Sequence, residues 1–181
     1  MQKQKWKLTI LDITTIGLMV AVIEVCKALF TYLPNIELTS FWLIIFTLYF
    51  GWKIIFVIPV FILIECAIYP LGVWVIMYLY VWPLLALLAW FFRKQESIWF
   101  WSLLSGGFGL CYGFLCAFTY IVTGTTENGL AGGLATAFAW WIAGIPWDIV
   151  HGVGNFVVMM VLYKPVKNVM KRVRQMMSAS S

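Results

Sequence analysis

The chain has 181 residues, of which 64% are hydrophobic and 10% are charged, and its formal net charge is +5. Soluble domains are about half apolar and about a quarter charged, so this composition excludes an ordinary soluble protein and predicts an all-α polytopic membrane protein. The basic residues gather at the ends of apolar segments and not on one exposed face, so we expect no nucleic-acid partner.

Six apolar segments are predicted within one membrane domain, residues 1–181. We place them at 8–33, 41–51, 54–69, 73–92, 98–123 and 134–163, with a basic cytoplasmic tail at 164–181. The first is too long for the core of a cleavable signal peptide, so we interpret it as a membrane helix. The second is shorter than the roughly 20 residues that a straight crossing needs, and we expect a short second helix.

The lysines and arginines predict how these segments are oriented. Six crossings place both termini on one side, and of the 12 Lys and Arg residues only Lys27 falls toward the other side. By the positive-inside rule, both termini are predicted to be cytoplasmic. The alternation of sides requires the short segment to cross. The outer face then holds the connections at 34–40, 69–72 and 124–133, which are polar or turn-like.

Nothing in the sequence indicates a metal site. The four cysteines lie in apolar segments without a Cys-x-x-Cys spacing, and His151 is the sole histidine. We therefore interpret the cysteines as small buried hydrophobic residues. A Gly-rich phosphate loop is also absent from the sequence. If the chain belongs to a transporter, another subunit would hydrolyse ATP.

The last segment carries polar residues where a membrane helix is usually apolar. Trp141, Asp148 and Asn155 are spaced by seven residues and, at about 100° per residue, share one face, with His151 beside it. Such side chains usually face a bundle interior or a cavity. They form a structural polar core (Asp148, His151 and Asn155), or Asp148 and His151 form a proton relay or an element that orients a ligand. An Asp-His hydrolase has weak support, because no nucleophile occurs at a matching spacing.

Further charges and many aromatic rings fall in the outer halves of the segments. Glu24 and Lys27 are three residues apart and can form a helix-end pair or part of an outward-facing polar site. Glu65 must face a cavity, a partner or the headgroups. The aromatic residues here are Trp74, Tyr78, Tyr120, Trp140, Trp141 and Trp147. Aromatic belts explain some of them, and the excess on one side fits a stacking site for a flat amphipathic ligand.

Two pairs of small residues are spaced to let helices approach closely. They are Gly17 with Ala21 in the first segment and Gly109 with Gly113 in the fifth. Packing within the chain is the default interpretation of such pairs. A docking role for the first pair needs other support.

Taken together, these features resemble a known family. The last segment reads Gly-Ile-Pro-Trp-Asp-Ile-Val-His-Gly-Val-Gly-Asn-Phe over 144–156, and Tyr-Lys-Pro-Val follows at 163–166. With its length and its six predicted segments, the whole chain resembles the substrate-binding (S) components of energy-coupling factor (ECF) vitamin transporters. The first-helix Ala-x-x-x-Ala of that family maps onto Gly17 and Ala21, with Gly in place of the first Ala.

The resemblance implies a non-catalytic subunit in a bacterial cytoplasmic membrane. Such subunits dock onto a transmembrane coupling subunit and two cytoplasmic ATPase subunits, here through Gly17 and Ala21. They bind a vitamin in an outward-facing site that is gated by the loop after the first helix, and they carry no metal or cofactor of their own. The site residues that we expect on this basis are Asn35, Glu37, Phe41, Trp42, Glu65, Tyr69, Trp74, Tyr78, Tyr120, Glu127, Asn128, Trp140, Trp141 and Trp147.

The ligand and two other functions remain open. The chain looks most like the branch that includes cobalamin-specific S components of lactobacilli, so cobalamin is the first expectation. The outer aromatic residues would also suit pyridoxine, riboflavin or a deazapurine. The alternatives are a stand-alone proton-coupled carrier, with Glu65, Asp148 and His151 as relay groups, and an intramembrane enzyme that uses Asp148 and His151.

Overall fold

The computed structural model describes residues 8–33 and 35–179, except for the side chains at 127, 128, 178 and 179. Within these ranges the chain is helical, as predicted, and contains no strand. The elements are α1 (Ile10–Leu29), α2 (Thr39–Phe50), the short 3-10 helix η1 (Gly51–Lys53), α3 (Ile54–Ile68), α4 (Val73–Phe91), α5 (Ile98–Leu110) and α6 (Tyr112–Ala179).

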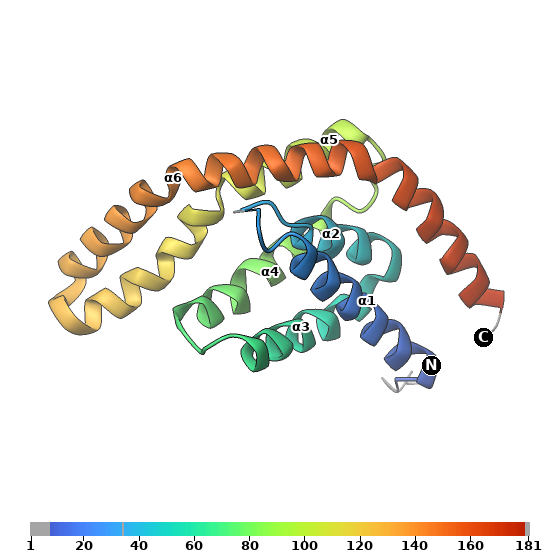
Figure 1. Ribbon diagram of the computed structural model, residues 1–181, viewed down its shortest axis with the longest axis horizontal. Helices are drawn as coiled ribbons and strands as arrows, with labels where there is room; N and C mark the ends of the chain where they lie inside the picture. Colours follow the sequence, from blue (N-terminus) through green and yellow to red (C-terminus); the bar gives the residue numbers. More distant parts are fainter. Residues whose placement is uncertain (1–7, 34, 180–181) are drawn as a thin grey trace, which may run out of the picture.

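The short helix α2 lies at the centre of the bundle. It contacts α1, α3, α4, α5 and α6, and the side chains of Phe41, Leu43, Ile44 and Ile45 are completely buried. A helix that is apolar on all sides is buried by its neighbours. The chain then turns back at Gly51, whose φ of +56° is easily adopted only by glycine, and continues as α3 (Figure 1).

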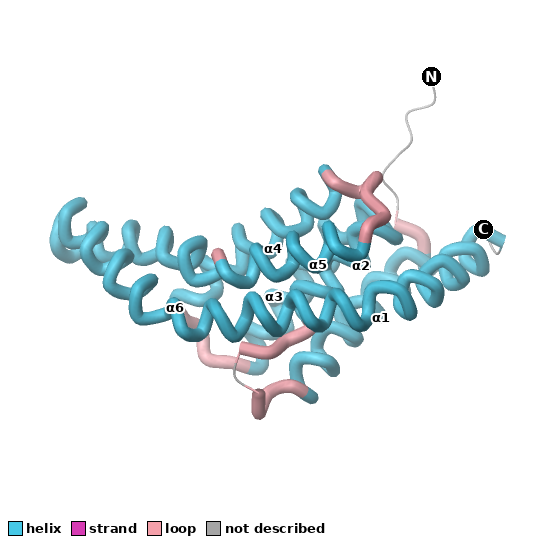
Figure 2. The backbone as a smooth tube through the Cα atoms, turned by 90° about the horizontal axis from the view of Figure 1, so that it is seen from above, coloured by secondary structure: helices cyan, strands magenta, loops and turns pink. Residues whose placement is uncertain are grey.

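A helical hairpin extends beyond the rest of the bundle. The chain reverses within α6 at Gly129, whose φ is +70°, and the two arms run side by side past α1–α4 (Figures 1 and 2). The predicted connection over 124–133 contains this reversal, but its residues are helical and do not form a loop. The hydroxyls of Thr125 and Thr136 donate to the carbonyls of Ile121 and Gly132, one turn back, so these threonines are accommodated in the helix.

Within the described residues, four helical stretches are long and apolar enough to cross a membrane, which indicates a membrane-embedded protein. They are Thr39–Ile68, Val73–Phe91, Ile98–Thr126 and Gly129–Met177. The 20-residue helix α1 carries Asp12, Glu24 and Lys27, and this charge lowers its apolar character. The first of the four stretches contains both α2 and α3, which are separated by the reversal at Gly51.

The helix ends differ from the predicted segments mainly after residue 98. The predicted segment at 98–123 is divided at Cys111 into α5 and the start of α6. The helix after Gly129 continues through Pro165 to Ala179, well past the predicted end at 163. Both described ends of the chain, Leu8 and Ala179, lie at the same end of the molecule (Figure 1).

Glycines bring α5 and α6 into close contact. A Cβ atom on Gly109 of α5 would lie 2.9 Å from the Cα of Gly152 of α6. Within α6, a Cβ on Gly124 would lie 2.9 Å from the Cα of Gly133, so the two arms of the hairpin are also close. Gly109 thus serves packing within the chain, as small residues do in membrane helices. Gly17 differs, because a Cβ there would meet nothing within 4 Å.

Candidate ligand-binding site

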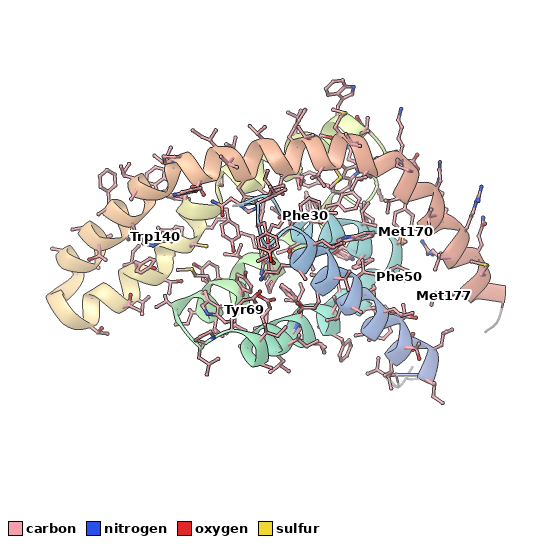
Figure 3. The ribbon with its side chains drawn as sticks, viewed as in Figure 1. Phe30, Phe50, Tyr69, Trp140, Met170 and Met177 are labelled. Carbon is pink, nitrogen blue, oxygen red and sulfur yellow. The ribbon has the colours of Figure 1, made fainter. Side chains whose placement is uncertain are left out.

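A cavity of about 600 Å³ opens in the half of the bundle away from the chain ends. Phe30 after α1, Tyr69 after α3 and Trp140 of α6 lie around it (Figure 3). The other lining residues are Lys27, Thr31, Leu33, Asn35, Ile36, Glu37, Glu65, Pro70, Trp74, Met77, Tyr78, Tyr112, Cys116 and His151. The cavity therefore combines aromatic walls with a small set of charged groups, which is the usual composition of a small-molecule site.

Lys27 of α1 forms an ion pair with Glu65 of α3 at the cavity wall. The Lys27 Nζ atom also lies 3.3 Å from the Tyr78 hydroxyl, and 5.5 Å and 5.3 Å from the ring centres of Tyr69 and Tyr78. Rings at this distance stabilise a cation. The partner of Glu65 is thus Lys27, and the ion pair ties α1 to α3.

Glu37 connects the loop after α1 to the middle of α6. Its Oε1 atom lies 3.9 Å from the His151 Nε2 atom, and its Oε2 atom accepts a hydrogen bond of 3.2 Å from the Thr39 hydroxyl. Asn35 turns the loop with φ of +55°, a conformation that Asn tolerates better than most residues. The loop therefore covers one side of the cavity and is held to α6 through a polar contact.

Some buried polar atoms of the site have no hydrogen-bond partner within the described residues. They are Oε1 of Glu65, Nε2 of His151 and Oε1 of Glu24. Glu24 lines a smaller cavity of about 280 Å³ together with Lys27, Glu65 and Tyr69, beside the first. Buried polar atoms are normally paired, so these atoms are positions where a ligand or water would bind.

Half of the predicted site residues line the cavity. They are Asn35, Glu37, Glu65, Tyr69, Trp74, Tyr78 and Trp140. Tyr120 stands behind this wall, because its ring centre lies 4.8 Å from that of Trp140. The side chains of Glu127 and Asn128 lie outside the described residues, so their predicted role has no structural account.

The remaining predicted residues face elsewhere. Phe41 is fully buried in the core, and Trp42 stacks on Phe46 with ring centres 5.2 Å apart. Trp141 packs on the far side of α6, 5.3 Å from the ring of Phe114. Trp147 is 52% exposed on the outer surface. These four residues therefore do not line the cavity, because a neighbouring position on a helix points in another direction.

His151 and Tyr112 are cavity residues that the expected site did not include. The ring of His151 is 5% exposed, and its centre lies 4.9 Å from that of Tyr112. His151 follows Trp140 by about three helical turns, so both residues lie on one face of α6. The spacing from Trp140 would have placed His151 in the cavity.

Asp148 turns away from this site toward the first turn of α6, and Asn155 turns toward α5. The Asp148 Oδ1 atom accepts a hydrogen bond of 2.9 Å from the backbone N–H of Gly113, just after the break at Cys111, where the first N–H groups of a helix lack intrahelical partners. A Cβ on Gly109 would lie 2.9 Å from the Asn155 Nδ2 atom. The polar stripe of α6 thus divides between a packing contact and the cavity.

No family model, curated protein or solved structure matches this chain. Within the described residues, no group of three or more His, Cys, Asp or Glu side chains is placed to hold a metal ion. The geometry of the cavity therefore carries the functional argument.

Proposed function

We propose that this chain is the substrate-binding subunit of an ECF-type importer in the bacterial cytoplasmic membrane. It would capture a vitamin from outside and deliver it inward when docked on a transmembrane coupling subunit and two ATPase subunits. The main support is the cavity of about 600 Å³, which is bordered on one side by a loop that contacts α6 through Glu37 and His151. An aromatic-lined cavity with a few charged groups is suited to binding a small molecule.

The lining favours a flat ligand with a hydrogen-bond donor or a positive charge. Three carboxylates, of Glu24, Glu37 and Glu65, lie in or beside the cavity, against one lysine, Lys27. Rings of Tyr69, Trp74, Tyr78 and Trp140 offer stacking surfaces. Cobalamin is the first ligand to test, and pyridoxine, riboflavin and a deazapurine are the others. The cavity volume of about 600 Å³ lies within the range of about 300–1,000 Å³ that is usual for small-molecule sites, and it suits the flat heterocycles. The larger corrinoid would require the loop after α1 to open.

The outer surface of α1 supports docking to a coupling subunit. Gly17 and Ala21 are both exposed, and the open space over Gly17 would let another helix approach closely.

Calorimetry of the detergent-purified chain with the four ligands tests the binding function. We expect one of them to bind with a Kd near the nanomolar range, or about −12 kcal/mol. Trp140→Ala should weaken binding at least about tenfold, since an aromatic pair contributes about 0.5–1.5 kcal/mol beyond the area that it buries. Trp147→Ala is the matched control, because Trp147 lies on the same helix and faces outward. Failure of all four ligands to bind would contradict the proposal.

Uptake into vesicles tests the coupled transport. Import should need ATP inside, the coupling subunit and both ATPases, and Gly17→Leu should abolish it without changing ligand affinity. Ala67→Leu, an equivalent enlargement at an exposed position on α3, should leave import intact. Uptake by the chain alone, driven by a pH gradient, would instead support a proton-coupled carrier.

A further inference from the structure

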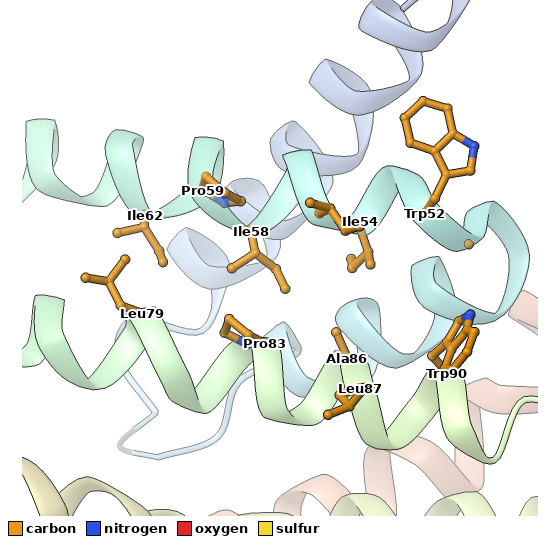
Figure 4. Close-up of a pocket in the computed structure, with 12 residues that line it drawn as sticks. Trp52, Ile54, Ile58, Pro59, Ile62, Leu79, Pro83, Ala86, Leu87 and Trp90 are labelled. Atoms are coloured by element: carbon orange, nitrogen blue, oxygen red, sulfur yellow. The ribbon is translucent and has the colours of Figure 1, made fainter. Parts of the chain in front are cut away.

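An apolar groove runs between α3 and α4 on the surface of the bundle. It encloses about 480 Å³, and its lining contains no charged side chain. Figure 4 shows Ile58 and Ile62 of α3 facing Leu79 and Pro83 of α4 along its length, with Trp52 and Trp90 at one end. Its length and apolar walls suit a hydrocarbon chain.

The tryptophan end of the groove adjoins a second, basic cavity of about 890 Å³. The two cavities share Gly51, Trp52 and Trp90. Phe50 and Met177, which also line the second cavity, lie at the end of the molecule that holds the described chain ends (Figure 3). The groove and the basic cavity are therefore adjacent, with these three residues between them.

Positive charge dominates the second cavity. Lys53, Arg93, Lys94 and Arg174 line it, and Asp12 is its one acidic residue. Asp12 is paired with Lys53 at 2.7 Å. Within the described residues, the other three basic side chains form no ion pair. The Arg93 guanidinium lies 4.2 Å from the centre of the Trp90 ring, and it also donates a 3.1 Å hydrogen bond to the Trp90 carbonyl, so its charge is held at the mouth of the groove.

We propose that the groove and the basic cavity together bind one anionic phospholipid. An acyl chain lies between α3 and α4, the glycerol lies between Trp52 and Trp90, and the headgroup phosphate faces Arg93, Lys94 and Arg174. Basic pockets at membrane depth bind anionic headgroups, and tryptophan prefers the membrane–water boundary. A free phosphate would make no use of the groove, and a neutral lipid would leave the basic side chains without a counter-charge. This site is separate from the cavity at the other end of the bundle.

Native mass spectrometry of the full chain in detergent tests the proposal, with dioleoylphosphatidylglycerol and dioleoylphosphatidylcholine as probes at equal concentration. We expect one phosphatidylglycerol to remain bound, with at least a tenfold preference over phosphatidylcholine. The double variant Lys94→Gln and Arg174→Gln should lose most of this preference. The double variant Lys171→Gln and Arg172→Gln removes the same charge from α6 outside the cavity, and it should retain the preference.

A second variant tests the groove itself. Leu87→Trp places a large ring within the groove and should lower the binding of both lipids at least fivefold, whereas Leu103→Trp, on the exposed surface of α5, should not. Equal binding of the two lipids by the wild-type chain would overturn the proposal. So would a preference that survives in the Lys94 and Arg174 variant, displacement of the lipid by inorganic phosphate, or a mass showing that a second protein chain occupies the groove.

Discussion

At the residue scale, the structural role of Asp148 is the one that its hydrogen bond supports, whereas the sequence allowed either a structural role or a proton relay. Its hydrogen bond to the Gly113 backbone joins α6 to the break after α5. Asp148→Ala should lower the free energy of unfolding by about 1–3 kcal/mol, because it leaves a buried N–H group without a partner. Thermal unfolding in detergent measures this loss. Asp148→Asn keeps an acceptor and should lose less, and an Ala variant as stable as the wild type would contradict the assignment.

Lys27 and Glu65 allow a second prediction at this scale. Within the described residues, Lys27 is the only basic partner of the buried Glu65 carboxylate, and Lys27→Met removes it. The free energy of unfolding should fall by about 3 kcal/mol. This is near the low end for a broken buried ion pair, because the Lys27 side chain is 20% exposed. The double variant Lys27→Met and Glu65→Gln should recover most of that stability. A double-mutant cycle measured by unfolding gives the coupling between the two residues. Additive losses would show that they do not interact.

His151 shows where sequence reasoning was too coarse. The helical spacing placed it beside Asp148 and Asn155 in one polar stripe, yet it borders the cavity, while Asp148 bonds to Gly113 at the start of α6 and Asn155 lies against Gly109 of α5. Residues three or four apart on a helix share a broad face, and different neighbours can pack on different parts of that face. Which neighbour each side chain contacts depends on the helices packed around it and not on the periodicity of the sequence alone.

At the element scale, the short helix α2 and a reversal between the last two segments could be predicted, whereas the helical conformation around that reversal could not. A short segment that is apolar on every side indicates a helix surrounded by others, and α2 is such a helix. The run of Gly and Thr at 124–133 is typical of a loop. The hydroxyls of Thr125 and Thr136 bond to carbonyls one turn back, so these threonines are accommodated in the helix. The chain reverses at Gly129, which has a positive φ.

Because α5 and α6 approach closely on one side only, alanine at two nearby glycines of α5 should change the free energy of unfolding in opposite directions. Gly109→Ala places a Cβ 2.9 Å from the Gly152 backbone and should destabilise the chain by about 1–3 kcal/mol through overpacking. Gly107→Ala meets nothing within 4 Å and should be neutral or stabilising by about 0.5–1 kcal/mol, because Ala favours a helix over Gly. Unfolding of both variants in one detergent measures the difference. Equal effects would rule out the glycine contact as the cause.

At the scale of the whole molecule, the cavity and the chain ends occupy opposite halves, and basic side chains gather with the ends. Lys53 pairs with Asp12, and Lys167 pairs with Glu96 at 3.3 Å, so part of the positive charge that predicts orientation also holds the connections at that end together. If both termini are cytoplasmic, as the positive-inside rule predicts, the cavity faces outward, as the proposed function requires.

Labelling of single cysteines in intact cells tests that arrangement. With the native cysteines replaced by alanine, Leu71→Cys reports on the loop between α3 and α4 beside the cavity, and Ser97→Cys reports on the loop between α4 and α5, where Arg93 and Lys94 lie. Both positions are exposed. A membrane-impermeant maleimide should modify the cysteine at 71 in intact cells and the one at 97 only after permeabilisation, because the basic loop is expected in the cytoplasm. Labelling of both after lysis is the control for reactivity. The reverse pattern would place the cavity on the cytoplasmic side, where it could not capture a vitamin from outside.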